Sequence, residues 1–287
     1  MNSHNSDHEN TVSKNPIPDR VVHFYSNIDY ALECIGLKEI TFIRREKVND
    51  PFDPWMKILF EFNNYDQMLV WEIENKPQKH VDEFRVRISE SQFNDNLKKI
   101  MDREDNFRKN YFLFSTCAPT TDTPPEHNLY MWGHYANGHR GVAVEFDTKK
   151  LNNELREKNI KEDVVQKIRY SNDIPRISFE MMDRFLMSKD NDAREIFNII
   201  DLTVRTKSIN WAQENEWRLV NHKDNTTINI LRVPLPDNAI THIYLGSEIY
   251  KTEEDRIVEE ARRLHPHAII SKAIKCKDKI GLEFQKI

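Results

Sequence analysis

HNLYMWGHYANGHRG, residues 127–141, is the stretch that decides the fold. It holds three of the six glycines of the chain, and the apolar residues 142–144 follow it directly. Leu129, Trp132 and Ala136 fall on one face of a helix, so we expect that face to be buried. The pattern therefore predicts a short helix that packs against the core.

The end of this stretch predicts a tight turn followed by a strand. Asn137 and Gly138 are residue types that tolerate a positive φ, which is typical of a helix end. The apolar, β-branched run after the turn favours a central strand. A helix that stops abruptly against a buried strand leaves polar and aromatic side chains near one sheet edge, where we expect a site: His134, Tyr135, His139 and Arg140.

The composition is that of a globular chain with a polar surface. Its 287 residues are 38% hydrophobic and 31% charged, which suits one large domain or two small ones. The net charge of −5 excludes a globally basic surface for nucleic acid, although a local basic groove stays open. The three cysteines form no CxxC pair, which excludes a zinc knuckle and favours a reducing, cytoplasmic setting.

We expect neither a secretory leader nor a membrane partner. Residues 1–15 are polar and lack an apolar run. No stretch approaches the roughly 18 apolar residues that a membrane span needs.

The order of the segments predicts an α+β fold. Residues 1–19, rich in Asn, Ser, His and Pro, predict a disordered tail ahead of a single α+β domain of catalytic type at 20–287. Strands and helices interleave irregularly, which favours a mixed, mainly antiparallel sheet over a doubly wound one. We predict strands at 20–25, 39–43, 111–115, 168–170, 217–220, 227–233, 240–245 and 267–273, and helices at 27–35, 77–101 (in two pieces), 177–187, 193–208 and 252–264, the last opened by a capping box.

Several common catalytic signatures are missing from the sequence. It contains no GxGxxG, no Walker A loop, no GxSxG elbow and no HExxH. The common nucleotide-binding folds and the serine hydrolases are therefore disfavoured.

Glu214 and Glu216 are the first candidates for chemistry. In an extended segment, carboxylates at i and i+2 project to the same side. Two like charges so placed raise the pKa of at least one. Such a pair could act on a sugar, with one carboxylate favouring oxocarbenium character and the other positioning or deprotonating an acceptor. The alternative is a solvated loop edge, which is the commoner reason for such a pair.

Other polar residues each allow two interpretations. Ser115 and Thr116 end a buried strand and could orient a ligand or merely cap a turn. His134 and His139 could share a metal with Asp50, Asp53 or Glu145, but no diagnostic ligand spacing is present, so we predict no metal site. His139 could instead brace the turn through a backbone carbonyl. Trp132 is expected in the core, Tyr135 is left open as a stacking platform, and the turn at 49–53 is expected to be structural.

Three motifs resemble an uncharacterised bacterial family, a domain of unknown function named DUF2971. They are the turn NDPF at 49–52, the block MWGHYA at 131–136 with His139 and Gly141, and Trp211 with ENEWR at 214–218. The pattern of that family has an N-D-P-F-E turn, an F-S strand end, an M-W-x-H-Y-A block with H-x-G, and an E-x-E-W-R ending. Asp53 stands where the pattern has Glu. The likeness spans about residues 21–245 and implies no activity.

The order of these features is also similar to that of the ADP-ribosyltransferase fold. In that fold an Arg or His of the first strand grips NAD, a Ser-Thr strand shapes the nicotinamide pocket, and the second Glu of a Glu-x-Glu pair holds the nicotinamide ribose. The resemblance implies an ADP-ribosyltransferase-like core with helical insertions and NAD as a substrate. Cys117 departs from it, since a second serine is common there.

The resemblance also implies roles for particular residues. Glu216 would be catalytic, and Glu214 would face the acceptor. The residues that would contact NAD are His23 or Arg20 on the first strand, with Arg44 also open, and Ser115 and Thr116 on the next. Placing Tyr135 and His134 near nicotinamide is our own assignment.

The implied function is a cytoplasmic, NAD-dependent ADP-ribosyltransferase that modifies a nucleic-acid base or a protein side chain. Such enzymes serve as bacterial toxins or phage-defence effectors, which allows an antitoxin or inhibitor partner. Two alternatives stay open: a metal-dependent nuclease that uses Asp50, Asp53, His134 and Glu145, and a non-catalytic binding or sensor module. The spatial test is whether Glu216, Ser115 and either His23 or Arg20 line one cleft.

Overall fold

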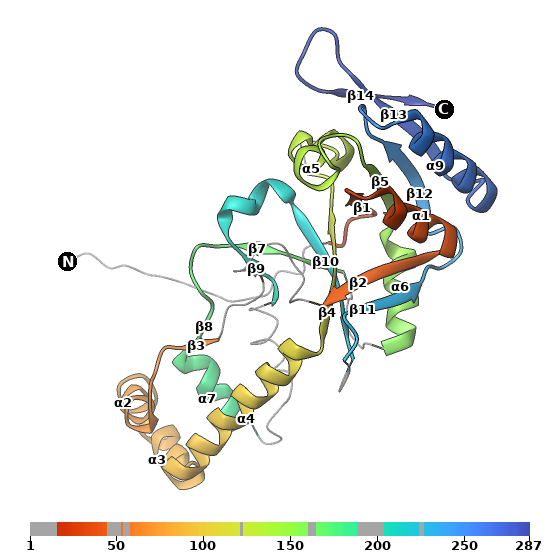
Figure 1. Ribbon diagram of the computed structural model, residues 1–287. Coiled ribbons are helices and arrows are strands. Elements are labelled where there is room, and N and C mark those ends of the chain that lie inside the picture. The colour runs from red at the N-terminus through yellow and green to blue at the C-terminus, as the bar shows by residue number, and fades with distance from the viewer. Residues whose placement is uncertain are drawn as a thin grey trace.

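The computed structural model describes residues 16–44, 53, 58–120, 123–159, 165–188, 204–223 and 227–287. Within these residues a ten-stranded sheet forms the centre of the molecule (Figure 1). Its main path, in spatial order, is β11 (Ile230–Pro234), β2 (Glu39–Arg44), β4 (Tyr111–Cys117), β1 (Arg20–Tyr25), β5 (Val142–Asp147), β12 (Ile240–Leu245), β13 (Ile269–Lys275) and β14 (Leu282–Lys286), while β10 (Glu216–His222) pairs with β4 and with β6 (Val165–Lys167).

The sheet is mixed and mainly antiparallel, which confirms the α+β prediction. Its parallel pair among the described strands is β12 with β13. A parallel pair needs a long crossover, and helix α9 (Lys251–Leu264) supplies it. Helix α9 packs against α1 (Ile28–Leu37), so both lie on the same side of the sheet (Figure 1).

Strand β4 is the point at which the sheet divides. One of its edges pairs with β10 along its whole length, from Tyr111 to Cys117. The other edge is shared, because β2 pairs with the start of β4 at Leu113 and β1 pairs with its end at Cys117. Ser115 lies between these two contacts, where β1 and β2 diverge.

A second group of elements forms a helical lobe at one end of the molecule (Figure 1). It has its own apolar cluster, which includes Met68, Phe84, Phe93 and Phe185. The lobe consists of α2 (Tyr65–Asn75), α3 (Gln78–Arg87), α4 (Glu90–Lys109), α7 (Phe179–Met187) and a two-stranded sheet of β3 (Leu59–Phe60) and β8 (Arg176–Ile177). The predicted helix at 77–101 is thus confirmed in two pieces, the second of which runs on to residue 109.

The stretch at 127–141 forms the expected helix and turn. Helix α5 (Leu129–Tyr135) begins at Asn128, whose side chain accepts hydrogen bonds from two backbone N–H groups of the first turn. Trp132 and Ala136 are fully buried. The prediction that Leu129 is buried is wrong, since this first residue of α5 is exposed.

The turn itself depends on one close approach of two backbones. Asn137, Gly138 and His139 all have positive φ. A Cβ atom on Gly141 would lie 2.1 Å from the carbonyl oxygen of Tyr25, the last residue of β1. Only glycine fits there, so Gly141 lets α5 return directly into β5 beside β1.

Some sequence predictions differ from the structure. Of the predicted helix at 193–208, residues 193–203 lie outside the described part, and Thr206–Lys207 forms strand β9, which pairs with β7 (Arg169–Tyr170). A 3-10 helix, η3 (Ile209–Glu214), follows β9. Helix α9 has Tyr250 at its N-cap and no side-chain cap hydrogen bond, so the capping box is wrong. Strand β14 was not predicted.

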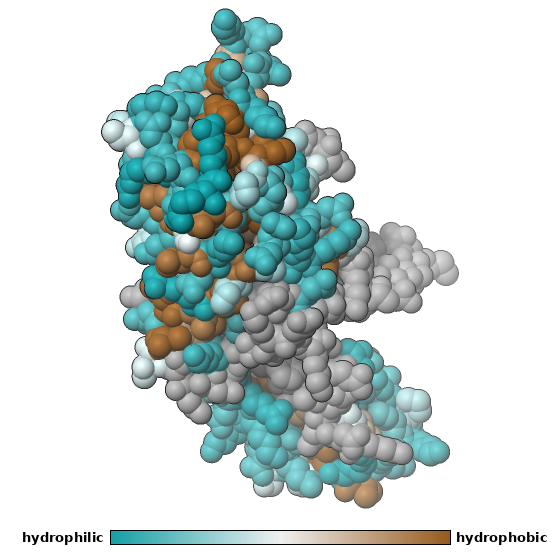
Figure 2. Space-filling view, turned by 90° about the vertical axis from the view of Figure 1, so that its right-hand side faces the viewer, coloured by the Kyte–Doolittle hydropathy of each residue, from teal (hydrophilic) through white to brown (hydrophobic). Residues whose placement is uncertain are grey.

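The remaining elements are α6 (Thr148–Asn159) and a second 3-10 helix, η2 (Pro125–His127). Residues 1–15 of the predicted tail lie outside the described residues. Of the tail residues that the structure describes, Ile17 packs against the main apolar cluster. In the described parts of the chain, no helix combines the length and apolar content that crossing a membrane requires. On the face that Figure 2 shows, apolar residues form separate patches among hydrophilic ones.

Candidate functional site

A cavity of about 530 Å³ lies at the division of the sheet. Side chains from α1, β1, β2, β4, α5, β9, β10 and β11 line it, together with Glu214 at the end of 3-10 helix η3. Its volume is within the range of small-molecule sites, roughly 300–1,000 Å³. Seven residues that the sequence analysis proposed lie on its wall: His23, Ser115, Thr116, His134, Tyr135, Glu214 and Glu216.

Arg20, the alternative to His23, lies elsewhere. The two residues are three positions apart in an extended strand, so their side chains point to opposite faces of the sheet. Arg20 forms an ion pair with Glu145 and another, at 3.2 Å, with Glu126. Arg20 is therefore committed to these two carboxylates and is not among the lining residues, so of the two candidates His23 is the one at the cavity. Arg44 is not among the lining residues, and its guanidinium lies over the Phe112 ring.

The imidazole of His23 is held in one orientation and one tautomer. Its Nδ1 lies 2.6 Å from the backbone carbonyl oxygen of Ser115. Burial lowers the pKa of His23 to about 4, against a smaller opposing effect of that hydrogen bond, so the ring is neutral at pH 7. A carbonyl only accepts, so Nδ1 carries the proton and Nε2 is left as an acceptor. Stacking on Phe114, with ring centres 4.3 Å apart, fixes the ring plane.

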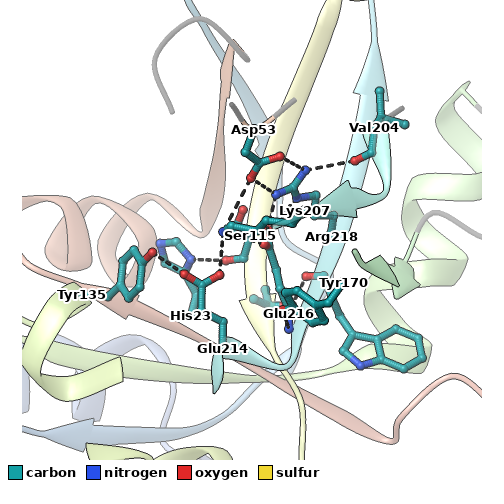
Figure 3. Close-up of polar contacts among 12 residues, drawn as sticks. His23, Asp53, Ser115, Tyr135, Tyr170, Val204, Lys207, Glu214, Glu216 and Arg218 are labelled. Atoms are coloured by element: carbon teal, nitrogen blue, oxygen red, sulfur yellow. Dashed lines mark hydrogen bonds and ion pairs between the residues drawn. The ribbon is translucent and has the colours of Figure 1, made fainter. Parts of the chain in front are cut away.

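Glu216 lies at the start of β10 and is held by two cations (Figure 3). Its carboxylate accepts hydrogen bonds from Arg218 at 2.5 and 3.0 Å and from Lys207 at 3.1 Å. Ser115 adds a hydroxyl hydrogen bond. Burial alone raises the pKa of Glu216, but Arg218 and Lys207 more than offset this and lower it to about 2. Glu216 is therefore ionised at any physiological pH.

Arg218 supports this arrangement from behind the cavity wall. It is fully buried and makes a two-pronged ion pair with Asp53, at 2.8 Å through one nitrogen and a closer contact through the other. Its third partner is the carbonyl oxygen of Val204. Residues 49–52 of the predicted turn lie outside the described part of the chain, and the ion pair of Asp53 agrees with the structural role that the sequence analysis favoured for it.

Glu214 and Glu216 do not form the predicted extended pair. Asn215 between them has φ 43° and ψ 52°, because the chain leaves 3-10 helix η3 there and enters β10. The two carboxylates instead converge on Lys207, whose Nζ lies 2.6 Å from Glu214 and 3.1 Å from Glu216. Lys207 is thus the shared cation of the pair.

Glu214 differs electrostatically from Glu216. Burial raises its pKa above the ordinary value, while Lys207 acts in the opposite direction and Glu216 adds to the rise. The Tyr135 hydroxyl donates a hydrogen bond of 2.5 Å to Glu214. Tyr135 is therefore a partner of the acidic pair, which the sequence did not indicate. The site therefore combines two different carboxylates: Glu216 is ionised at physiological pH, and Glu214 binds a proton more readily.

The hydroxyls of the β4 end serve different purposes. Thr116 donates its hydroxyl to the carbonyl oxygen of Trp217 at 2.7 Å, so that group is committed to the sheet. Ser115 faces Arg218 across the β4–β10 pair, and its side chain lies on the same sheet face as Glu216. Of the two predicted hydroxyls, Ser115 is the one that belongs to the polar network of the cavity.

The metal ligands of the nuclease alternative are not brought together. Asp53 pairs with Arg218, Glu145 with Arg20 and Tyr244, and the His134 ring packs on Tyr130. Asp50 lies outside the described residues. His139 stacks on Trp132 and is not among the lining residues, and its buried Nδ1 has no hydrogen-bond partner among the described residues, so that nitrogen does not brace the turn through a carbonyl.

This network coincides with a family motif. Residues 131–219 match the model of a family described as "Protein of unknown function (DUF2971)". The match bears out the resemblance to DUF2971 on the MWGHYA block and the ENEWR ending. No curated protein and no solved structure matches the chain.

The matched segment, residues 131–219, contributes five polar residues of the wall: His134, Tyr135, Lys207, Glu214 and Glu216. It also contains Arg218 and most of α5, whereas His23 and Ser115 come from outside it. The sequence analysis missed Lys207 because a helix was predicted through Ser208. The Glu216–Arg218 pair could have been found, because residues at i and i+2 of a strand share a face and carry opposite charges here.

Proposed function

We propose that this chain is an NAD-dependent ADP-ribosyltransferase whose nicotinamide and adjoining ribose bind in the cavity between β1 and β4. The observation that carries the proposal is the convergence of His23, Ser115 and Glu216 on one cavity. His23 and Ser115 are 92 residues apart in the chain, and Glu216 follows 101 residues later (216 − 115). Their convergence is the arrangement that the resemblance to the ADP-ribosyltransferase fold implies.

The chemistry of the wall suits a ribose that becomes cationic. The network of Asp53, Lys207, Glu214, Glu216 and Arg218 carries a net charge of −1 when all are ionised, because three carboxylates meet two cations. A fixed negative charge stabilises an oxocarbenium ion more than the neutral ribose. Glu216, whose low pKa keeps it ionised, would hold a ribose hydroxyl, and His23 Nε2 would accept a second hydrogen bond from the substrate.

The proposed step balances without a metal. The bond between nicotinamide N1 and ribose C1′ breaks, and its electron pair leaves with the neutral nicotinamide. A nucleophile of the acceptor then forms a bond to C1′ and loses a proton. Glu214 would take this proton, since its pKa is raised by burial and it lies beside Tyr135 at the cavity.

The class of acceptor follows from the same resemblance. We propose a macromolecule, either a nucleic-acid base or a protein side chain, and a role as a bacterial toxin or phage-defence effector in the cytoplasm. An antitoxin or inhibitor would then be a natural partner.

Nicotinamide release tests the proposal. Purified wild type, Glu216→Gln and Glu33→Gln are each incubated with NAD and bacterial lysate, and free nicotinamide is measured by chromatography. Glu33 lines the same cavity but pairs with Arg232, so its variant is a matched control. We expect Glu216→Gln to lose about 100-fold or more of the rate, as when one group that stabilises charge in a transition state is removed.

Equal rates for wild type and Glu216→Gln, or no release by wild type with lysate present, would refute the proposal. Saturable NAD binding without release would favour the non-catalytic sensor.

A further inference from the structure

The helical lobe contains a second cluster of ionisable groups, well separated in sequence from the cavity network. Glu72 of α2, His80 of α3 and Asp183 of α7 come from three different helices. Their ligand atoms all lie within 4.8 Å of one another. None of the three residues lines the cavity described above.

The spacing within this cluster fits a metal ion. His80 Nε2 lies 3.3 Å from Glu72 Oε2 and 2.9 Å from Asp183 Oδ1. Zinc bonds to nitrogen and oxygen are about 2.0–2.2 Å long, which places two tetrahedral ligands about 3.4 Å apart. The two measured distances from His80 Nε2 are therefore close to the separation of ligands around one ion.

Glu72 supplies an independent reason to expect a ligand. Its side chain is 0% exposed, and both carboxylate oxygens lack a hydrogen-bond partner among the described residues. Buried carboxylates are almost always hydrogen-bonded, paired or bound to a metal. A divalent cation would compensate this buried group.

We propose that Glu72, His80 and Asp183 bind a divalent transition-metal ion of the Zn²⁺ class, which clamps α2, α3 and α7 together. One imidazole nitrogen with two carboxylates favours Zn²⁺ over Mg²⁺ or Ca²⁺, which prefer oxygen ligands alone. His80 is partly exposed, so water can complete the coordination. The site is structural, and it is independent of the activity proposed for the cavity.

Lys76 makes the proposal sharply testable. Its ammonium lies 3.1 Å from the other oxygen of Asp183 and also pairs with Glu180. If the cluster were only an ion-pair network, Lys76 would be one of its stabilising members. If it is a metal site, the Lys76 charge competes with the ion.

The experiment compares variants of the full chain after treatment with a chelator. Zn²⁺, Mn²⁺ and Mg²⁺ are added in turn, and the melting temperature and the Zn²⁺ affinity are measured, the latter by competition with a chromophoric chelator. We expect Zn²⁺ at about 100 times its Kd to raise the wild-type Tm by roughly 5 °C or more. Glu180→Gln, which changes the neighbouring exposed carboxylate, should behave like wild type.

Three variants then decide the outcome. His80→Gln and Asp183→Asn should each weaken Zn²⁺ binding by at least about 10-fold and lose most of the Tm rise. Lys76→Met should bind Zn²⁺ more tightly than wild type. Equal stabilisation of wild type and both ligand variants, no Zn²⁺ binding by wild type, or weaker binding by Lys76→Met would each overturn the proposal. Should one ligand variant fail to fold, Co²⁺ added to wild type must still give the visible absorption of a protein-bound ion.

Discussion

His23 Nδ1 donates a 2.6 Å hydrogen bond to the carbonyl oxygen of Ser115, and this bond joins β1 to β4 where the two strands have begun to separate. The carbonyl would otherwise need a partner from the neighbouring strand. A side chain thus takes the place of a backbone N–H, so the sheet can open without leaving a buried acceptor unpaired. The same hydrogen bond thus allows β1 and β4 to separate at the cavity and fixes the orientation of the His23 imidazole.

The first prediction concerns His23 and acid stability. The folded pKa of about 4 lies below the ordinary 6.5, so the unfolded chain binds more protons between these values and stability falls as the pH drops from 6.5 to 4. The loss attributable to His23 is at most about 3 kcal/mol, at about 1.4 kcal/mol per pH unit. Urea unfolding of wild type and His23→Gln at pH 7 and 5 measures it. The variant should lose less stability than wild type, and parallel losses would show that His23 is not buried as a neutral ring.

Lys207 gives the second prediction. Replacing this buried ammonium by Met leaves Glu214 and Glu216 without their shared cation. We expect a loss of about 3 kcal/mol at pH 8. The loss should shrink at pH 5, because the already raised pKa of Glu214 rises further without Lys207 and the carboxyl takes up a proton. Lys149→Met, which removes an exposed ion pair with Asp19, should leave stability nearly unchanged. A pH-independent loss in Lys207→Met would contradict this description of the pair.

The third prediction concerns Tyr135. Its hydroxyl donates to Glu214 and lowers the pKa of that carboxyl. In Tyr135→Phe the pKa of Glu214 should rise, so the acidic limb of the pH–rate profile for nicotinamide release should move to higher pH. Tyr130→Phe, on the same helix, serves as the control. An unshifted profile would mean that Glu214 does not act in its ionised form.

The fourth prediction tests the turn after α5. Gly141→Ala would place a Cβ atom 2.1 Å from the Tyr25 carbonyl oxygen, between two strands that are already paired. We expect a loss of about 2–3 kcal/mol in the free energy of unfolding. Gly133→Ala is the matched control, because its Cβ would meet no atom within 4 Å and alanine is the better helix former. If both variants were equally stable, the close approach at Gly141 would not hold the turn.

The sequence was informative where a residue acts through a local pattern. The apolar residues of β1, the long apolar run of β4 and the Asn-Gly helix end each predict their element from neighbours alone. The order His23, Ser115, Glu216 identified three residues of the cavity wall. The choice between His23 and Arg20, which the resemblance left open, is made by tertiary contacts, because Arg20 pairs with Glu126 and Glu145 while His23 lines the cavity.

Other features depend on contacts that a sequence pattern does not encode. Lys207 enters the site from the two-residue strand β9, which is too short to show a period and which the helical pattern at 193–208 concealed. The carboxylate of Asp53 meets Arg218 across 165 positions of the chain. Asn215 adopts a left-handed conformation, so the Glu-x-Glu pair is bent rather than extended. In each case the conformation and contacts of the residue depend on tertiary pairing and not on the local propensity of the sequence.

The most direct test of the central claim is a crystal structure of Glu216→Gln soaked with NAD, in which binding should persist while cleavage is slow. The account predicts nicotinamide in the cavity between β1 and β4, its ribose hydroxyls beside residue 216, and a substrate hydrogen bond to His23 Nε2. NAD bound at another surface, or an empty cavity at NAD concentrations that saturate any binding in solution, would contradict it.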